Sequence, residues 1–164
     1  PEDGVVNDVF TIDFPQNITQ VHFIKLRLFD TKGKEVANTF YWRSNDKYEG
    51  RKTLTGPTSS GFEDLSKLKQ VQLKTRYKAY QEGDRHFIKA EIKNPSSTVA
   101  FFTQLQLLDQ DKKPVRPSFY TDNFFSLLPG ESKTVIIETA TSDMPSEPTF
   151  VVKGWNIKSN NFKL

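Results

Sequence analysis

Apolar and polar residues alternate along much of this chain, and a period of two indicates β-strands. The alternation is clearest over Val21–Phe29 and returns over Val36–Trp42, after a polar turn at residues 30–34. An earlier apolar segment, Val5–Phe14, ends at Pro15, which cannot donate a ladder hydrogen bond. This part of the chain therefore predicts one strand followed by a β-hairpin.

Three strands with apolar faces need a second sheet to cover them. We therefore expect residues 1–46 to be the C-terminal strands of a truncated β-sandwich domain. Large exposed apolar patches are rare on monomers, so the uncovered face predicts self-association through these strands or docking onto the second domain of the chain.

The next segment has the composition of a connection. Between Ser44 and Gly61 the chain is polar and rich in Gly, Ser and Thr, which is typical of a linker or a long surface loop. Phe62–Leu68 has apolar residues three apart, enough for a single helical turn at most. We therefore interpret residues 47–69 as a linker with a short helical turn.

Short apolar segments then recur at regular spacing, separated by turns that carry Asp, Asn, Gly and Pro. The expected strands are Val71–Tyr80, His86–Lys93, Ala100–Leu108, a short one near Val115–Tyr120, Ser132–Thr139 and Thr149–Ile157. Such strands, with no helical period between them, favour a complete immunoglobulin-like β-sandwich over residues 70–164. The side chains expected to face inward are Phe87, Ala90, Ile92, Phe102, Leu105, Leu107, Val135 and Ile137.

Residues 118–135 read as strand, corner, turn and strand, and the rest of the sandwich is expected to be organised around them. Asp and Asn bond back to nearby amides, and Pro-Gly presets a tight turn. The residues expected to fix this corner are Tyr120, Asp122, Asn123, Pro129 and Gly130. Phe124, with Leu127 or Leu128, is expected to anchor it in the core.

Composition excludes several classes of function. The 164 residues include no cysteine, which rules out disulfides, thiol catalysis and thiolate metal sites. The formal charge of +3 is spread along the chain, so we interpret it as a solubility feature and expect no nucleic-acid partner. No apolar run approaches the roughly 20 residues of a membrane span, and the first residues do not resemble a signal peptide.

Residues for catalysis are sparse. His22 and His86 lie far apart in the sequence, and the paired carboxylates fall in expected turns, where solvated charge is the simplest interpretation. There is no Gly-x-Ser-x-Gly elbow and no phosphate-binding glycine loop. The sequence therefore predicts no catalytic residue, no metal ligand and no cofactor.

Aromatic residues are the remaining indication of a binding site. Tyr41, Trp42 and Trp155 are candidates for stacking on sugar rings, as in carbohydrate-binding sandwiches, or for packing between the two domains. Packing in a core or between domains is the more common use of such residues.

Several segments resemble one family of enzymes. They are Val21–Asp30 with the Gly33-Lys34 turn, Asn38–Trp42, Phe62–Leu73, Ala100–Asp109 and, most specifically, Phe119–Glu131. Together they are similar to the C-terminal immunoglobulin-like region of family 2 glycoside hydrolases of the β-mannosidase and exo-β-glucosaminidase type. The linker, Tyr48–Gly61, is longer than the family pattern.

The resemblance implies that residues 1–46 end one immunoglobulin-like domain and residues 70–164 form the next, beyond a catalytic barrel that would be the main partner. It implies a retaining β-glycosidase as the parent protein, located in a periplasm or outside the cell, and an inactive scaffold fragment here. Two alternatives stay open: an accessory module that binds carbohydrate, and a cell-surface adhesion sandwich.

Overall fold

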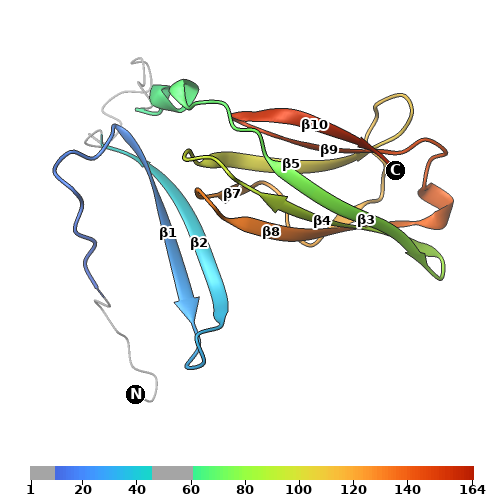
Figure 1. The fold of residues 1–164 in the computed structure, drawn as a ribbon, viewed down its shortest axis with the longest axis horizontal. Helices are drawn as coiled ribbons and strands as arrows, with labels where there is room; N and C mark the ends of the chain where they lie inside the picture. The colour runs from blue at the N-terminus through green and yellow to red at the C-terminus, as the bar shows by residue number, and fades with distance from the viewer. Residues whose placement is uncertain (1–9, 46–60) are drawn as a thin grey trace, which may run out of the picture. The chain divides into compact units, whose positions relative to one another are not determined.

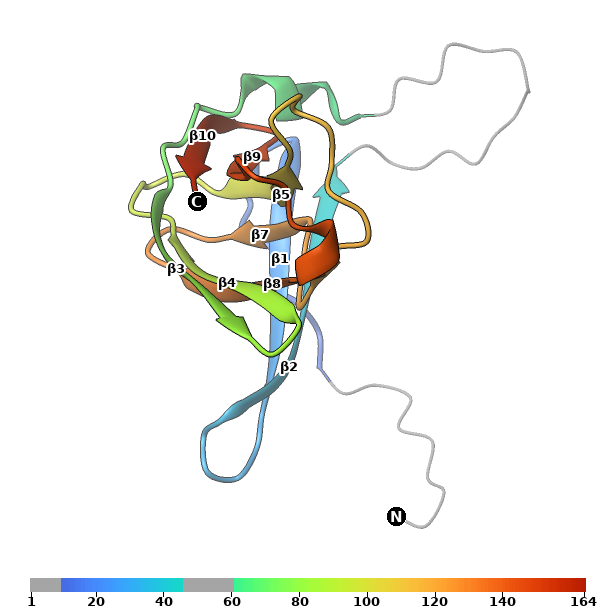
Figure 2. The same cartoon turned by 90° about the vertical axis from the view of Figure 1, so that its right-hand side faces the viewer.

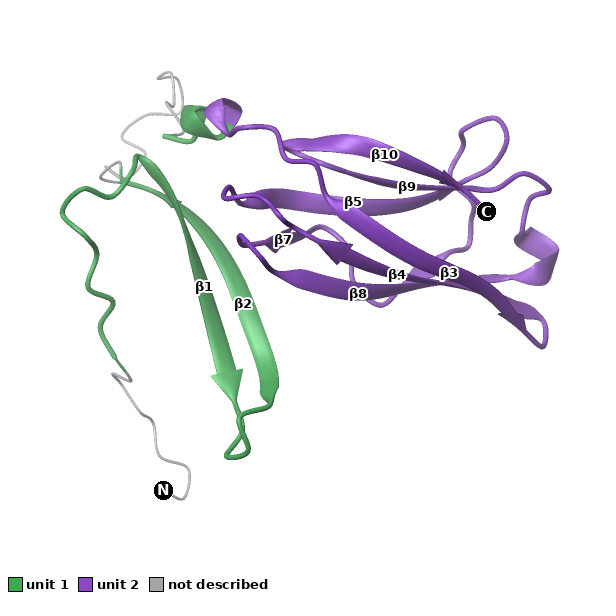
Figure 3. Cartoon of the chain, viewed as in Figure 1, with its two compact units in different colours: residues 1–65 green, residues 66–164 purple. Residues whose placement is uncertain are grey.

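The structure, a computed structural model, describes residues 10–45 and 61–164 of the chain (Figure 1). The chain divides into two compact units, residues 1–65 and residues 66–164 (Figure 3). Most of the expected linker lies outside the described residues. The expected helical turn is confirmed as a short 3-10 helix, η1, at Glu63–Lys67.

Unit 1 contains an antiparallel hairpin of β1 (Val21–Phe29) and β2 (Glu35–Ser44), as the alternation predicts. Asp30 closes the turn, because its Oδ1 accepts a hydrogen bond of 2.9 Å from the backbone N–H of Lys34. Gly33 has a φ of 77°, a left-handed conformation that glycine adopts without steric penalty.

The strand expected at Val5–Phe14 is wrong where the structure describes it. Residues 5–9 lie outside the described residues, and Phe10–Phe14 form no strand. A strand needs a neighbour for its backbone N–H and C=O groups, and in the described part of unit 1, residues 10–45 and 61–65, β1 and β2 pair only with each other. Apolar alternation alone did not reveal that Phe10–Phe14 have no strand partner among these described residues.

Unit 2 is a sandwich of two antiparallel four-stranded sheets, seen end-on in Figure 2. One sheet has the order β3 (Lys74–Glu82), β4 (Arg85–Lys93), β8 (Ser132–Ala140) and β6 (Phe119–Tyr120). The other has the order β10 (Ile157–Lys163), β9 (Thr149–Gly154), β5 (Ala100–Leu108) and β7 (Phe125–Leu127). A second 3-10 helix, η2 (Thr141–Asp143), follows β8. The predicted all-β sandwich is confirmed.

The core lies between these sheets and uses every second residue of the central strands. Six of the expected inward-facing side chains are buried: Ala90, Ile92, Leu105, Leu107, Val135 and Ile137. Phe87 is not among them. Ile88, the next residue of β4, faces the core, so the side chain of Phe87 faces away from it. Phe87 stacks instead on Tyr80 of the neighbouring strand β3, with ring centroids 5.3 Å apart.

Phe102 is the second inward prediction that is wrong. The pairing of β5 with β7 shifts register between Ala100 and Thr103, and Phe102 has a φ of 57°. Such a bulge reverses the phase of the side chains that follow it. Thr103 is consequently buried and Phe102 faces solvent.

The segment Thr149–Ile157, expected as one strand, is two. β9 ends at Gly154, and β10 begins at Ile157 after a two-residue turn, so Trp155 lies in a turn and not in a strand. A Cβ on Gly154 would lie 2.9 Å from the carbonyl oxygen of Phe102, which explains the glycine where the hairpin packs on β5. Trp155-Asn156 is not a common turn pair, so the sequence did not indicate this hairpin.

The first and last segments of unit 2 meet. Val71, expected within the first strand, forms an isolated parallel bridge with Ile157 instead. Its N–H donates to the carbonyl of Asn156 at 2.7 Å, and its own carbonyl accepts from Lys158 N–H at 2.9 Å. The sandwich is therefore closed by contacts between its two ends.

Candidate functional site

The corner predicted at residues 118–135 is held by side chains that replace strand pairing. Asn123 is the central one: its Oδ1 accepts from the backbone N–H of Leu105 at 2.8 Å, and its Nδ2 donates to the carbonyl of Leu105 at 3.0 Å. Its Oδ1 also accepts from the N–H of Phe124 at 3.1 Å. One amide thus satisfies both backbone groups of a residue in β5.

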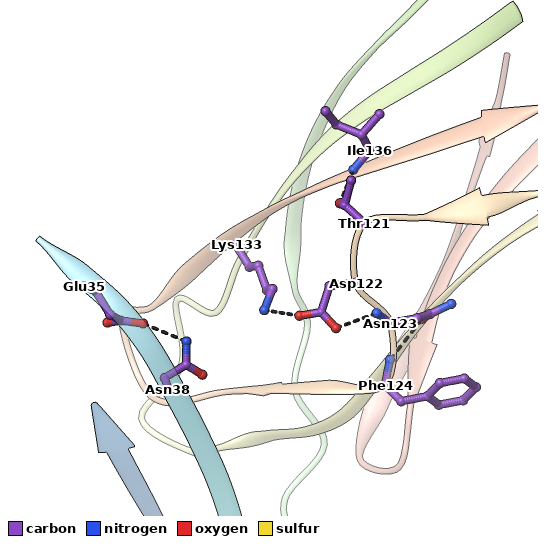
Figure 4. A network of polar contacts seen from close by, with 8 residues as sticks. All are labelled: Glu35, Asn38, Thr121, Asp122, Asn123, Phe124, Lys133 and Ile136. Carbon is purple, nitrogen blue, oxygen red and sulfur yellow. Dashed lines mark hydrogen bonds and ion pairs between the residues drawn. The ribbon is translucent and has the colours of Figure 1, made fainter. Parts of the chain in front are cut away.

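Asp122 fixes the same turn from its other side. One carboxylate oxygen accepts from the N–H of Asn123 at 2.7 Å, and the other forms an ion pair with Lys133 (Figure 4). The Nζ of Lys133 also lies 5.1 Å from the centroid of the Phe125 ring, a cation–π distance. Asp122 therefore links the corner to the start of β8.

Tyr120 reaches across the sandwich. Its hydroxyl oxygen accepts from the N–H of Leu107 at 3.0 Å, and burial raises the pKa of the Tyr120 phenol above its usual value of 10.0. Thr121 continues the pairing with β8, since its N–H donates to the carbonyl of Ile136 and its Oγ1 accepts from the N–H of Ile136, both at 3.0 Å (Figure 4).

Pro129 and Gly130 occupy the middle of a tight turn. The N–H of Glu131 donates to the carbonyl of Leu128 at 3.1 Å, and Gly130 has a φ of 81°, the conformation of the third residue of a type II turn. Gly130 N–H also donates to the carbonyl of Asn94 at 2.9 Å. The five corner residues therefore make or shape contacts within unit 2 itself: with β5, with the start of β8, and with the backbone of Asn94.

Phe124 does not anchor this corner, contrary to expectation. It has a φ of 58° and is half exposed, whereas the next residue, Phe125, and Leu127 are buried in the core. The left-handed residue turns the chain so that β7 begins at Phe125, which takes the inward position.

Phe124 belongs instead to a row of aromatic side chains on unit 2, the aromatic row: Trp155, Phe101, Phe102 and Phe124. Successive ring centroids lie 6.5, 5.5 and 5.6 Å apart. Phe101 is buried, while Trp155, Phe102 and Phe124 are 60%, 39% and 50% exposed. Of the three aromatic candidates from the sequence, Trp155 alone lies here.

A buried amide holds the row in place. Asn156 is almost fully buried, and its Nδ2 donates to the carbonyls of Lys69 at 2.9 Å and Val99 at 2.8 Å. Its Oδ1 accepts from the N–H of Phe101 at 2.9 Å, and Trp155 N–H donates to the carbonyl of Phe101 at 3.0 Å. Sequence reasoning missed Asn156, because a single Asn after Trp carries no signal of burial.

Tyr41 and Trp42 lie in unit 1. They are neighbours on β2, so their side chains point to opposite faces of the hairpin: Tyr41 lies opposite Ile24 and Trp42 opposite Phe23. The structure therefore does not bring these two rings together on one surface.

Reactive groups do not gather in the described part of the chain. Within residues 10–45 and 61–164, no group of three or more His, Asp or Glu side chains could hold a metal ion. No helix in these ranges is long and apolar enough to cross a membrane. His22 packs edge-on against Phe14, with ring centroids 5.4 Å apart, and has no acidic partner there.

The decisive comparison is with a family model, that of the exo-β-D-glucosaminidase Ig-fold domain, which matches residues 53–157. The chain belongs to this family. The resemblance to the exo-β-glucosaminidase type of family 2 glycoside hydrolases, and with it the immunoglobulin-like fold, is thereby confirmed. The β-mannosidase part of the resemblance stays a prediction.

Relatives of this Ig-fold chain carry the name exo-β-D-glucosaminidase. That of Streptomyces avermitilis is 31% identical over 85% of the chain, and that of Amycolatopsis orientalis is 30% identical over 93%. The chain spans only 16% of the length of each. The exo-chitosanase CsxA of Amycolatopsis orientalis has the same fold, with a TM-score of 0.81 at 24% identity over 94% of this chain and 19% of that one.

Proposed function

We propose that this chain is a non-catalytic module of a larger exo-β-D-glucosaminidase-type glycoside hydrolase, in which it serves as a structural scaffold for the catalytic barrel. Two facts support the proposal: the chain covers about a sixth of its relatives' length, and the described residues hold no group of three or more His, Asp or Glu side chains that could bind a metal ion. The corner residues, which carry the most specific part of the resemblance, bind the protein's own backbone.

The single observation that carries the scaffold role is the hairpin of unit 1. On one face Ile24 lies opposite Tyr41, Leu26 opposite Thr39, and Leu28 next to them is 62% exposed. A two-stranded hairpin is marginally stable in water without further packing. We infer that this face is covered in the working protein, by the rest of the parent polypeptide or by a second copy of the chain.

Activity tests the non-catalytic part of the proposal. The isolated chain should release no product from a chromogenic β-D-glucosaminide above the level of buffer alone. Turnover that survives repurification and is lost on unfolding would contradict the proposal.

The scaffold role is tested in the full-length parent hydrolase. Ile88→Asp, in the core of unit 2, should speed thermal inactivation and leave the KM of the remaining enzyme unchanged. Asn161→Asp, exposed on β10 opposite Val151, is the control and should change neither. A raised KM with unchanged stability would point to a role in binding substrate.

The uncovered face is tested by sedimentation of the isolated chain. We expect association that Leu28→Lys reduces and that Thr31→Lys, in the exposed turn, leaves unchanged. A wild-type chain that stays monomeric at high concentration would remove self-association from the proposal.

A second candidate function is carbohydrate binding, and the aromatic row favours it, because exposed aromatic faces stack on sugar rings. The chain has two tryptophans, so Trp42→Phe leaves Trp155 as the single fluorophore and Trp155→Phe leaves Trp42. Oligosaccharides of glucosamine should change the fluorescence of the first variant only. No response at millimolar sugar would exclude this candidate.

The family resemblance further leads us to propose that the parent protein works in a periplasm or outside the cell. Fractionation of the source cells tests this location, and recovery of the parent protein only with the cytoplasmic fraction would contradict it.

A further inference from the structure

Positive charges that are dispersed in the sequence meet on the outer face of one sheet in unit 2. Lys74, Arg76 and Lys78 alternate along β3, and Lys89 and Lys93 lie on β4. All five are exposed, and alternate residues of a strand share a face. We call these five residues the basic face; β3 and β4 lie side by side in Figure 2.

Like charges stand directly opposite each other across these strands. Lys74 pairs with Lys93, and Lys78 pairs with Lys89, while Arg76 lies opposite Glu91 between them. Directly opposed like charges destabilise a sheet. The fold thus retains two repulsive pairs where a carboxylate in either strand would remove the repulsion.

The neighbouring strand does not compensate for them. Each pair of opposed residues on β3 and β4 continues onto β8, which pairs with the other side of β4, and we call these lines of residues rows. In them β8 places Ser132 opposite Lys93, Thr134 opposite Glu91 and an aliphatic side chain opposite Lys89. Among residues 10–45 and 61–164, none of the five cations forms an ion pair within 4.0 Å. Five cations and one carboxylate give these rows a formal charge of +4, against +3 for the entire chain.

We propose that the basic face binds an acidic polysaccharide, a linear glycan with carboxylate or sulfate groups at regular intervals. Cations about 7 Å apart along a strand and about 5 Å apart across strands form a flat grid that can meet successive anions of an extended polymer. The repulsion between opposed lysines is relieved when a polymer anion lies between them.

Other polyanions fit the face less well. Sites for single-stranded nucleic acid interleave aromatic rings with the cations, whereas the rows of the basic face contain none. The nearest aromatic pair, Tyr80 and Phe87, lies at one end and stacks on itself. Surfaces that bind membranes combine basic residues with apolar ones that enter the interface, and these rows lack exposed apolar side chains.

The inference goes beyond the proposed scaffold role. Glucosamine polymers carry amines that are largely protonated in acid, and the basic face would repel them. It would therefore recognise a different component of the carbohydrate surroundings, one that holds the protein near its site of work without touching the reacting sugar.

The test uses the full chain on immobilised polygalacturonate and heparin, with a neutral glucan as the reference polymer. We expect binding to both acidic polymers, none to the glucan, and release as salt rises. Lys74→Gln with Lys93→Gln should weaken binding on the order of tenfold. The matched control, Lys32→Gln with Lys34→Gln in the hairpin turn of unit 1, removes the same charge and should bind as the wild type does.

A second measurement separates binding from folding. Because the opposed lysines repel each other, the Lys74/Lys93 double variant should unfold at a higher temperature than the wild type while binding more weakly. Lys78→Gln with Lys89→Gln should behave in the same way, which provides an independent pair if the first variant folds poorly.

Several results would overturn the proposal. They are failure of the wild type to bind either acidic polymer, an equal loss of binding in the control variant, or tighter binding to single-stranded DNA or to anionic vesicles than to the polysaccharides at equal salt. Failure of these tests would leave the scaffold role untouched, because that role depends on unit 1 and on the core.

Discussion

Phe102 and Phe124 lie with their ring centroids 5.6 Å apart, and both have a left-handed backbone, with φ values of 57° and 58°. Bulky residues seldom adopt this conformation, because the Cβ approaches the following carbonyl oxygen. Two such residues are in contact here, and both rings are exposed to solvent. We interpret this as local backbone strain that is retained at an exposed aromatic surface.

Replacing Phe124 by glycine tests this strain. Glycine adopts positive φ readily, so Phe124→Gly should change the free energy of unfolding by no more than about 1 kcal/mol in either direction. The matched control is the next residue: Phe125→Ala, in the core, should cost about 3 kcal/mol or more. Urea unfolding measures both, and equal losses would show that Phe124 contributes as a core residue does.

The amide of Asn123 is the corner's principal support. Asn123→Ala leaves the N–H and the carbonyl of Leu105 without these partners, and we expect a loss of about 2 kcal/mol in the free energy of unfolding. Asn161→Ala, exposed on β10, should change it by less than about 0.5 kcal/mol. Similar unfolding midpoints for the two variants would contradict the role assigned to Asn123.

Gly154 should resist replacement by alanine, although its φ is not left-handed. Gly→Ala normally stabilises a site with an ordinary backbone by about 0.4–1 kcal/mol. Here the added Cβ would approach the backbone oxygen of Phe102 to 2.9 Å, so we expect a loss of stability. Thermal unfolding of Gly154→Ala decides the sign, and a stabilised variant would show that the β9–β10 hairpin can move away from β5.

Tyr120 should make stability fall at high pH. Burial raises its pKa in the folded state above the unfolded value of about 10, so the unfolded chain loses the phenolic proton first. The contribution is fully present below pH 10 and is lost as pH rises toward the folded pKa. Unfolding midpoints between pH 8 and pH 11 should fall more steeply for the wild type than for Tyr120→Phe.

If the unfolding midpoints of the wild type and of Tyr120→Phe fall equally steeply with pH, groups other than Tyr120 cause the loss of stability at alkaline pH. At neutral pH, Tyr120→Phe should still be less stable by about 1 kcal/mol, because the N–H of Leu107 loses its acceptor.

The parts of the fold that the sequence predicted are those set by side-chain alternation. Ile92, Leu107 and Val135 were placed correctly because strict alternation on central strands leaves one buried face. Phe102 and Phe124 were misplaced because a bulge or a left-handed residue changes the phase without changing composition. The preferences of residues for turns did not predict the turn at Trp155 either. The β9–β10 hairpin there is fixed by packing against β5 and not by a favoured pair of turn residues.

The candidate surfaces were less predictable than the core. Lysines at every second position look evenly dispersed in the sequence, and only the pairing of β3 with β4 places Lys74 beside Lys93. The aromatic row likewise combines residues from three separate segments. Surfaces of this kind depend on strand register, which depends in turn on contacts distant in sequence.

The bridge between Val71 and Ile157 bears on how the protein is made. The entry segment of unit 2 stays bound through backbone bonds to Asn156 and Lys158, residues near the end of the sandwich. During synthesis this entry segment, which precedes β3, therefore has no backbone partner until the final hairpin has left the ribosome. The sandwich is complete only after that hairpin is made, so a ribosome that stalls shortly before Trp155 would leave a chain with an open core, a target for chaperones and proteases.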